Sequence, residues 1–295
     1  LRAAGSVVAA ATDATRIGNA FEVEVDTGAF SDCVVDALEQ TGRVDVIRSE
    51  ADPRDIEGVT VIATGPKTTS TVARPLYRRL GKKYRFFHGA TEPLIVGDSI
   101  DTDLAWRERR FAEENPEYLN CAIDEAGFDE CLSIMSSALG RYEDIPETDH
   151  FAPFAPIEFA AAGEPRRLLG GPLSGSGITD PNDGEEPFGA CHLTPVDADE
   201  KVWRIVDGRT GLKPELQARL WRVFPALREA EFVRYGSFHQ AVYLQAPRVL
   251  DETLQLRNGA PMFIAGGLTG VCSYSAAAAT GYIAGMNAAR LSIGE

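Results

Sequence analysis

Pro261-Met262-Phe263-Ile264-Ala265-Gly266-Gly267 is a short apolar run that ends at two glycines, and it is the clearest indication of the fold class. Thr269-Gly270 follows, and a helix is expected from about Ser273 to Leu291. A buried strand that leads through glycines into a helix places free N–H groups and a positive helix-dipole end at the carboxyl edge of a sheet. That edge suits an anionic or carbonyl-bearing cofactor. The residues expected to bind it here are Gly266, Gly267, Thr269, Gly270, Val271 and Cys272.

A second strand, from the N-terminal third, is expected to open onto the same edge. The run 58–63 stops abruptly at Thr64-Gly65-Pro66, so Thr64 and Gly65 are further candidates for cofactor binding. Around it the sequence alternates between helix and strand, which is typical of parallel strands with covering helices. The expected elements are a helix with Phe30, Val34 and Leu38 on one face that ends at Gly42, a strand at 44–47, a helix at 68–80 and a strand at 84–87. The fold class is therefore α/β.

The middle of the chain has a different character and indicates an inserted α+β domain. Helices are expected near 103–114, where Asp101 would cap the first turn, and near 124–139. A hairpin is expected from 191–193 and 202–206, and a helix with Leu212 and Leu220 on one face ends at Pro225. Within the C-terminal helix, Gly281 and Gly285 are four residues apart and suggest a close backbone approach.

Composition narrows the classes of function. The formal net charge is −15, from 44 acidic and 29 basic residues, which disfavours nucleic-acid binding because that binding depends on Lys and Arg. No apolar run is long enough to span a bilayer, so no membrane association is expected. Five widely spaced cysteines without a C-x-x-C pair argue against a disulfide framework and a zinc site, and fit a cytoplasmic protein. We expect no metal, and the sequence leaves the oligomeric state open.

Several motifs in order along the chain resemble the TrmFO family of FAD- and folate-dependent tRNA uracil-5 methyltransferases. They are Ile62-Ala63-Thr64-Gly65-Pro66, Asp98-Ser99-Ile100-Asp101, Tyr118-Leu119-Asn120-Cys121, Pro156-Ile157-Glu158, Phe232-Val233-Arg234-Tyr235-Gly236, Ala265-Gly266-Gly267-Leu268-Thr269-Gly270 and 284–290. The resemblance implies a split FAD-binding, Rossmann-like domain of the glutathione-reductase type, interrupted by a smaller insertion domain. On this basis residues 1–105 and 236–295 form the FAD-type domain and 106–235 the insertion. It also implies transfer of a methylene carbon from methylenetetrahydrofolate to a tRNA uridine.

The first departure from the family pattern concerns the cofactor. The resemblance implies FAD, a nucleotide cofactor, but the sequence has no G-x-G-x-x-G loop after a first strand to hold the FAD pyrophosphate. The nearest pattern, Gly175-Ser176-Gly177, is not followed by an expected helix. Leu1-Arg2 aligns inside a helix of the family, so the chain is either a fragment of a longer gene product or has lost this segment.

Further departures affect the chemistry. Phe154 occupies the position of the family's nucleophilic Cys, and a phenyl ring cannot supply the thiolate that attacks uracil. A family Lys becomes Ser174, a His-Arg-Asn run becomes His239-Gln240-Ala241, and a Trp becomes Pro214. We therefore expect a divergent TrmFO-like flavoprotein that has lost methyl transfer, with neither folate nor tRNA binding. Two alternatives stay open: an active methyltransferase with a relocated nucleophile, and a scaffold without cofactor.

Weaker candidates complete the set. If the nucleophile moved, Cys121 and Cys272 are the residues to consider, whereas a Cys191-His192 dyad is disfavoured because neighbours in a strand face opposite ways. Basic residues of the insertion domain either meet an anion or form a solvated face; they are Arg204, Arg209, Lys213, Arg219 and Arg222. The candidates for a substrate pocket are Arg209, Thr210, Lys213, Tyr235 and His239. The acidic loop 180–186 is expected to be a solvated turn.

Overall fold

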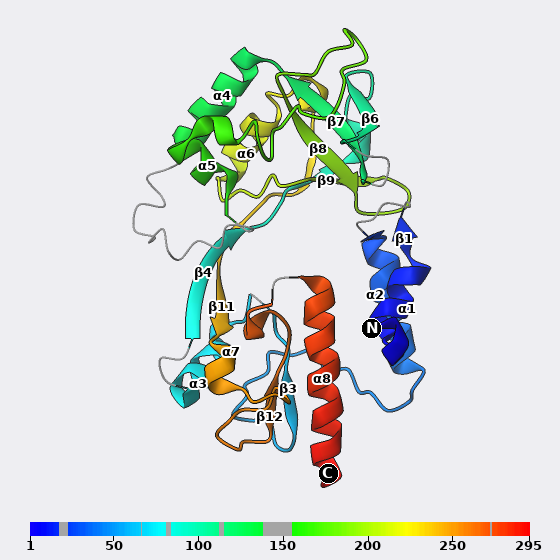
Figure 1. The fold of residues 1–295 in the computed structure, drawn as a ribbon, viewed down its shortest axis with the longest axis vertical. Helices are drawn as coiled ribbons and strands as arrows, with labels where there is room; N and C mark the ends of the chain where they lie inside the picture. The colour runs from blue at the N-terminus through cyan, green and yellow to red at the C-terminus, as the bar shows by residue number, and fades with distance from the viewer. Residues whose placement is uncertain (18–22, 66, 81–83, 112–114, 138–154, 272) are drawn as a thin grey trace. The chain divides into compact units, whose positions relative to one another are not determined.

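The computed structural model divides the chain into two compact units (Figure 1). It describes residues 1–17, 23–65, 67–80, 84–111, 115–137, 155–271 and 273–295. Unit 1 comprises Leu1–Ala10, Asp36–Phe87 and Gln240–Glu295, and unit 2 comprises Ala11–Val35 and His88–His239. Strands β4 (Tyr84–Ala90) and β11 (Phe238–Leu244) pair with each other, and the boundary between the units falls inside both strands.

Unit 1 is built on a parallel pair of strands from distant parts of the sequence. Strands β3 (Thr60–Ile62) and β12 (Met262–Ile264) run side by side, with Met262 opposite Thr60 and Ile264 opposite Ile62. Both strands and the helix expected at 68–80, α3 (Ser70–Leu80), are confirmed. The remaining elements of this unit are the short helix α7 (Ala246–Val249), the 3-10 helix η8 (Gly266–Thr269) and α8 (Tyr274–Ser292).

Strand β12 is buried on both faces, as parallel strands usually are. Ile264 packs with Ile62 and with Leu76 of α3, while Phe263 packs with Ala284 and other residues of α8. The close approach on α8 is therefore made by alanines. A Cβ added at Gly281 or Gly285 would meet nothing within 4 Å, so the expected close backbone approach at those two glycines is wrong.

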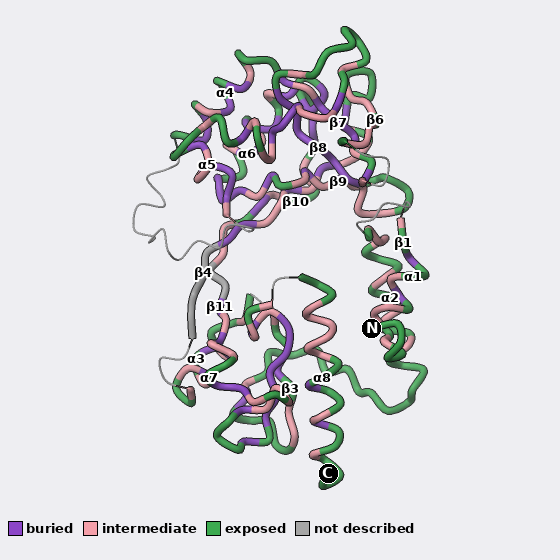
Figure 2. The backbone as a smooth tube through the Cα atoms, in the orientation of Figure 1, coloured by how far each residue is buried: buried purple, intermediate pink, exposed green. Residues whose placement is uncertain are grey.

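Unit 2 contains a six-stranded antiparallel sheet in the order β10-β5-β9-β8-β7-β6. The strands are β5 (Leu94–Val96), β6 (Ala105–Arg109), β7 (Glu117–Ile123), β8 (Gly189–Pro195), β9 (Val202–Ile205) and β10 (Phe232–Arg234). The helices are η2 (Gly97–Ser99), α4 (Glu125–Ser136), α5 (Ile157–Gly163), η6 (Pro165–Arg167), α6 (Pro214–Trp221) and η7 (Pro225–Leu227). Strands β7 and β8 carry many of the buried residues (Figure 2).

The expected hairpin and two expected helices of this unit are confirmed. Strands β8 and β9 pair with Leu193 opposite Ile205, α4 starts at the side-chain cap of Asp124, and α6 starts at a proline that suits a first helical position. The helix expected near 103–114 is wrong. Residues 105–109 form β6 because their backbone pairs with β7, and Asp101 accepts from Asp103 N (3.0 Å) in a turn rather than capping a helix.

The N-terminal residues form short elements. They are η1 (Arg2–Ala4), α1 (Val7–Ala14), the paired strands β1 (Arg16–Ile17) and β2 (Glu24–Val25), and α2 (Thr27–Glu39), which confirms the helix expected before Gly42. The strand expected at 44–47 is wrong: Val46 is 57% and Ile47 82% exposed, and the segment has no strand beside it among the described residues. Without a neighbour to share backbone hydrogen bonds, a β-rich run does not become a strand.

Candidate functional site: a glycine-lined edge and a buried polar cluster

The two strand ends that the sequence assigns to a cofactor lie next to each other in unit 1. The N–H of Ala265 donates to the carbonyl of Ile62 (2.9 Å), which continues the parallel pairing to the carboxyl ends of β3 and β12. Thr64-Gly65 and Gly266-Gly267 follow directly after these ends. The sequence-based prediction that both runs open onto one edge is thus confirmed.

Glycine is required at this edge for conformational and steric reasons. Gly65 has φ +74° and Gly266 has φ +68°, values in the left-handed region that disfavours other residues. A Cβ at Gly65 would meet nothing within 4 Å, and one at Gly266 would reach only the Cβ of Ala277 at 4.0 Å. Both glycines therefore leave space in which a ligand can approach the backbone closely.

Hydroxyl groups of the edge order its turns. Thr64 Oγ1 lies 2.7 Å from Thr68 Oγ1, which donates to the carbonyl of Gly65 (2.7 Å). Thr269 Oγ1 donates to the carbonyl of Gly266 (2.9 Å), and the N–H of Gly266 donates to Thr280 Oγ1 (2.9 Å). The N–H of Gly266 is thus already used within the protein, so a ligand would have to meet the backbone of Gly65 or the first turn of η8.

The helix that follows the edge, α8, starts at Tyr274, two residues after the candidate Cys272. Ser273 is the N-cap of α8, and its Oγ accepts from the N–H of Ala276 (3.1 Å). Val271 lies half-buried before it, after Gly270 with φ +92°. Cys272 and Phe154 both lie outside the described residues.

In unit 2, the five substrate-pocket candidates come from three places: Arg209, Thr210 and Lys213 precede α6, Tyr235 follows β10, and His239 lies in β11. Thr210 is buried and its N–H donates to the carbonyl of Thr91 (3.3 Å). Tyr235 stacks on Phe232, with ring centroids 4.8 Å apart. Lys213 is exposed before α6, and His239 Nδ1 is 3.5 Å from the carbonyl of Ser237.

Gln217, which sequence reasoning missed, joins these two segments. Its amide donates to the carbonyls of Leu212 (2.6 Å) and Gly236 (2.8 Å), and its Oε1 accepts from the N–H of Gly236 (2.8 Å). A Cβ at Gly236 would come within 2.8 Å of the Thr210 carbonyl oxygen, so only glycine allows this approach. The signal in the sequence was a polar residue beside Leu216 and Leu220 on the apolar side of α6.

Glu158 fixes the same loop from the other side. Its side chain is fully buried, and Oε1 accepts from the N–H of Gly211 (2.8 Å). The neighbouring N–H of Ile157 donates to the carbonyl of Arg209 (2.8 Å). The motif Pro156-Ile157-Glu158 therefore has a structural role, which is to hold the 209–211 loop against α5.

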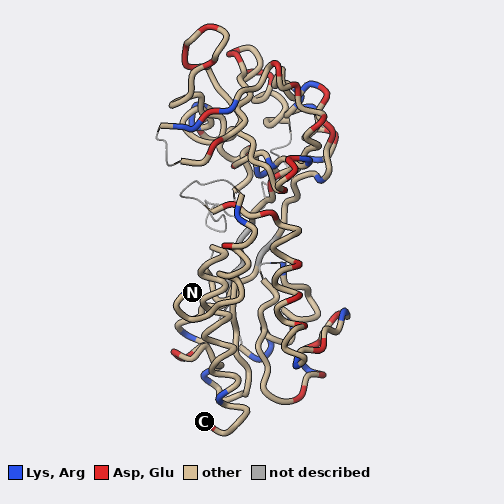
Figure 3. The backbone as a smooth tube through the Cα atoms, turned by 90° about the vertical axis from the view of Figure 1, so that its right-hand side faces the viewer, with Lys and Arg blue, Asp and Glu red and all other residues tan. Residues whose placement is uncertain are grey.

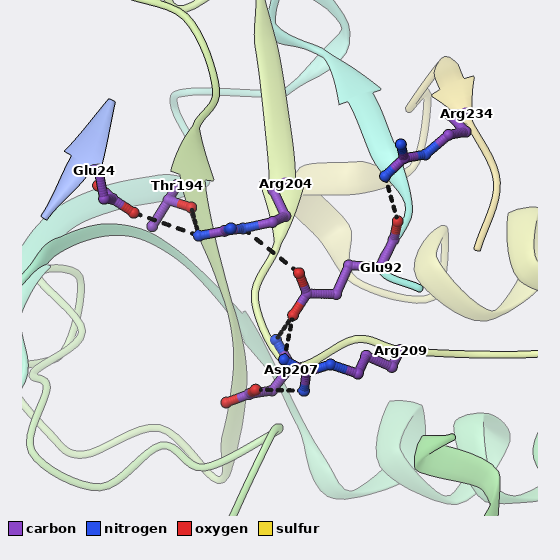
Figure 4. A network of polar contacts seen from close by, with 7 residues as sticks. All are labelled: Glu24, Glu92, Thr194, Arg204, Asp207, Arg209 and Arg234. Carbon is purple, nitrogen blue, oxygen red and sulfur yellow. Dashed lines mark hydrogen bonds and ion pairs between the residues drawn. The ribbon is translucent and has the colours of Figure 1, made fainter. Parts of the chain in front are cut away.

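Arg209 and Arg204 are both paired with carboxylates (Figure 4). Glu92, whose side chain is 14% exposed, lies 3.2 Å from Arg209 and 3.6 Å from Arg204. Arg209 also pairs with Asp207 (2.8 Å), and Arg204 with Glu24 (3.5 Å). Both arginines thus belong to a network of ion pairs, in which their guanidinium groups already have carboxylate partners.

Three described cysteines of unit 2, Cys121, Cys131 and Cys191, lie in its core, whereas Cys33 on α2 is half-buried. Cys121 of β7 is directly opposite Cys191 of β8, and both are fully buried. Burial raises the pKa of Cys191, and it raises the pKa of Cys131 to about 12. The Cys131 and Cys191 thiols are therefore protonated, and all three thiols are out of contact with solvent, so they do not resemble nucleophiles.

His192 points away from Cys191 and forms no dyad with it. Its Nδ1 lies 2.8 Å from Asn120 Oδ1 and its Nε2 3.0 Å from the carbonyl of Ser174. Burial, and then the positive charge of Arg110, lower the pKa of His192 to about 4. In the described part of the chain, no group of three or more His, Cys, Asp or Glu side chains could hold a metal ion.

Together these features define a divided α/β protein: one unit has a parallel strand pair that ends at a glycine-lined edge, and the other has an antiparallel sheet. The family model described as glucose inhibited division protein A matches residues 1–295. The chain belongs to this family. No helix in the described ranges is long and apolar enough to cross a membrane.

The curated relatives carry the name methylenetetrahydrofolate–tRNA-(uracil-5-)-methyltransferase TrmFO. The relative from Thermus thermophilus is 36% identical over 296 residues, which are all of this chain and 66% of that protein. The one from Geobacter sulfurreducens is 35% identical over 301 residues, all of this chain and 68% of that protein. The chain thus spans about two thirds of the length of these relatives, and its resemblance to TrmFO is confirmed.

A solved structure supports the fold. GidA from Aquifex aeolicus, in its form I crystal, superimposes with a TM-score of 0.67 at 17% identity, over 97% of this chain and 55% of that one. At this identity the likeness concerns the fold alone. It confirms the predicted α/β fold class of the GidA and TrmFO type.

Proposed function

We propose that the chain belongs to a TrmFO-like flavoprotein that binds FAD at the carboxyl edge of β3 and β12. The observation that carries the proposal is the pair of adjacent glycine turns, at Gly65 and Gly266, with open space above both. Unit 1 then represents the FAD-type domain and unit 2 the insertion domain. The reduced thiols of unit 2 fit a cytoplasmic location.

The residues at this edge fit part of the cofactor. The backbone at Thr64 and Gly65, and the start of η8 at Gly267, would contact it through N–H groups, because the first N–H groups of a helix have no partner within it. Bound FAD would supply two-electron redox chemistry. No residue is assigned to the pyrophosphate, since the sequence has no G-x-G-x-x-G loop.

We further propose that folate-dependent methylation of tRNA, which the relatives' name states for them, has been lost here. Phe154 stands in place of the family's nucleophilic cysteine, and Cys121 is fully buried opposite Cys191. These observations disfavour a nucleophile moved to Cys121 and leave Cys272 as the other candidate. In this proposal neither folate nor tRNA is a ligand.

An absorption spectrum tests the first part of the proposal. The purified gene product, incubated with FAD and separated from free cofactor, is expected to show the bands of oxidised flavin at about one equivalent per chain. A protein without flavin bands, even at saturating FAD, would refute flavin binding and favour a scaffold without cofactor.

A methylation assay tests the second part. The protein is incubated with unmodified tRNA, methylenetetrahydrofolate and FAD, and 5-methyluridine is measured by mass spectrometry of the digested tRNA. We expect none above background. If the base is formed and Cys272→Ser abolishes it, methyl transfer has been retained through a relocated nucleophile.

A further inference from the structure

We propose that unit 1 contains a second binding site, a pocket for a small organic dianion whose phosphate monoester or paired carboxylates are attached to an apolar body. The pocket has a volume of about 330 Å³, and all of its lining belongs to unit 1. The lining combines three arginines with four apolar residues: Arg54, Arg78, Arg79, Pro53, Pro75, Leu76 and Met262. None of these residues takes part in the function proposed above.

Positive charge in this pocket is only partly neutralised. Arg54 is held by Asp52, whose two carboxylate oxygens both lie 3.0 Å from Nε, and these hydrogen bonds lower the pKa of Asp52 to about 2. The negative charge of Asp55 also attracts Arg54 electrostatically. Arg78 and Arg79, in the last turn of α3, have no carboxylate within 4.0 Å among the described residues. The pocket therefore keeps the positive charges of these two arginines.

The surrounding sequence makes this charge unusual for the chain. Acidic residues are spread along the chain (Figure 3), and the formal net charge is −15. The stretch 74–85 nevertheless contains no Asp or Glu, and its basic residues are Arg74, Arg78, Arg79, Lys82, Lys83 and Arg85. Cations in the last turn of a helix stabilise its C-terminus, but that effect does not require an adjoining apolar pocket.

The apolar part of the lining defines the rest of the ligand. Pro53, Leu76 and Met262 are buried, and with the half-buried Pro75 they give the pocket a hydrophobic floor. A volume of about 330 Å³ is at the lower end of the range for small-molecule sites. Guanidinium groups bind carboxylate and phosphate oxygens in pairs, so a compact aromatic or aliphatic dianion matches both surfaces.

This pocket is separate from the proposed flavin site. Met262 is the first residue of β12, and Pro53 and Arg54 precede β3, so these parts of the lining lie toward the amino ends of the strands. Gly65 and Gly266 follow the carboxyl ends of the same strands. A ligand in the pocket would therefore leave the flavin edge accessible.

Phenyl phosphate and phthalate, titrated by calorimetry into the full chain at saturating FAD, test the proposal and distinguish a phosphate from a dicarboxylate source. At least one is expected to bind, and to bind better than inorganic phosphate or phenol. The double variant Arg78→Gln/Arg79→Gln is expected to weaken binding about tenfold or more, as for lost charge-assisted hydrogen bonds. Arg78→Lys/Arg79→Lys keeps the positive charges but loses the paired N–H donors of the guanidinium groups, and is expected to bind with intermediate strength.

Arg74→Gln is the matched control, because Arg74 is exposed on the same helix and does not line the pocket. It is expected to change binding less than twofold, because salt screens the interaction between the ligand and an exposed charge outside the pocket. Equal binding by the double Gln variant would overturn the proposal. The proposal would also be overturned if inorganic phosphate bound as tightly as phenyl phosphate, or if only an RNA oligonucleotide bound. Binding of the probe only in the absence of FAD would overturn it as well, because it would place the probe at the flavin edge.

Discussion

Ala265 donates its N–H to the carbonyl of Ile62, and this single hydrogen bond joins the last residue before one glycine turn to the strand that leads into the other. Ile62 and Ala265 are both buried, at 5% and 0% exposure. The candidate cofactor edge therefore exists only when segments from opposite ends of the chain are paired, and its geometry depends on the core beneath it.

Ile264→Ala is expected to destabilise unit 1 by about 2–5 kcal/mol, because it removes a fully buried side chain from the β12 core. Ile264→Val, the conservative control, is expected to cost about 1 kcal/mol. All tryptophans (Trp106, Trp203 and Trp221) lie in unit 2, so tryptophan fluorescence follows that unit and far-UV circular dichroism follows both. For Ile264→Ala, the urea midpoint measured by circular dichroism is expected to fall, while the midpoint measured by tryptophan fluorescence stays the same. A fluorescence midpoint that falls equally would contradict separate unfolding.

Gly65→Ala is expected to weaken FAD binding, since a methyl group would occupy the space at the edge. Gly259→Ala is its matched control: Gly259 has φ +77°, also with nothing within 4 Å, but lies in the turn that precedes β12. Both changes are expected to cost about 1–2 kcal/mol of stability through backbone strain. Flavin titration is expected to show a larger dissociation constant for Gly65→Ala alone. Equal flavin affinity of the two variants would remove Gly65 from the site.

The sequence predicted the elements whose signals are local. Strands β3 and β12, each stopped by glycine, and helix α8, with its serine cap, are of this kind. Residues 105–109 were expected to be helical because their own pattern does not distinguish the two states, and pairing with β7 decided the outcome. The run 44–47 failed for the converse reason, since it has strand-forming residues but no partner among the described residues.

Acidification is expected to destabilise unit 2 through His192. Its pKa falls from 6.5 to about 4 on folding, so below pH 6.5 the unfolded chain takes up the proton first. The contribution of the neutral His192 to the free energy of unfolding is present in full above about pH 6.5. It is lost as the pH falls to about 4, by up to about 3 kcal/mol. His192→Gln is expected to flatten the difference in unfolding free energy, measured by tryptophan fluorescence, between pH 7 and pH 4.5. An unchanged slope would show that His192 is not the titrating group.

Thiol labelling is expected to separate Cys33 from the cysteines of the core. Cys33 is half-buried on α2, whereas Cys121, Cys131 and Cys191 are fully buried. Iodoacetamide on the native protein is expected to modify Cys33, with the three core cysteines labelled only in denaturant, as judged by peptide mass spectrometry. Rapid labelling of Cys121 in the native protein would contradict its burial and restore it as a nucleophile candidate.

Glu92→Gln is expected to destabilise unit 2 by about 1–3 kcal/mol, because Arg204 and Arg209 lose a poorly exposed carboxylate. The control is Glu164→Gln, which breaks the exposed pair with Arg167, where both side chains are more than half exposed. That change is expected to cost less than about 0.5 kcal/mol. The two variants are compared in urea by tryptophan fluorescence. Equal costs would mean that the Glu92 network adds nothing beyond a surface ion pair.

Site residues that lie in locally recognisable turns could be predicted from the sequence, whereas those that depend on distant contacts could not. Gly65 and Gly266 were identified because strand–glycine turns are visible in the sequence. Gln217 and Glu92 were missed because their role comes from contacts with segments far away along the chain. Arg209 was chosen as a substrate residue, and in the structure its guanidinium is paired with Glu92 and Asp207. The role of each of these residues depends on which side chains it contacts, and the spacing of residues in the sequence does not predict those contacts.

The division of unit 1 into separate chain segments also determines when it can fold. Most of unit 2 is continuous from His88 to His239 and can complete its sheet as soon as that stretch has left the ribosome. Strand β3, made early, has to wait for β12, near the C-terminus, and closing so long a loop slows folding. Until then Val61 and Ile62 of β3 lack their partner strand, so newly made chains are vulnerable to aggregation before synthesis ends.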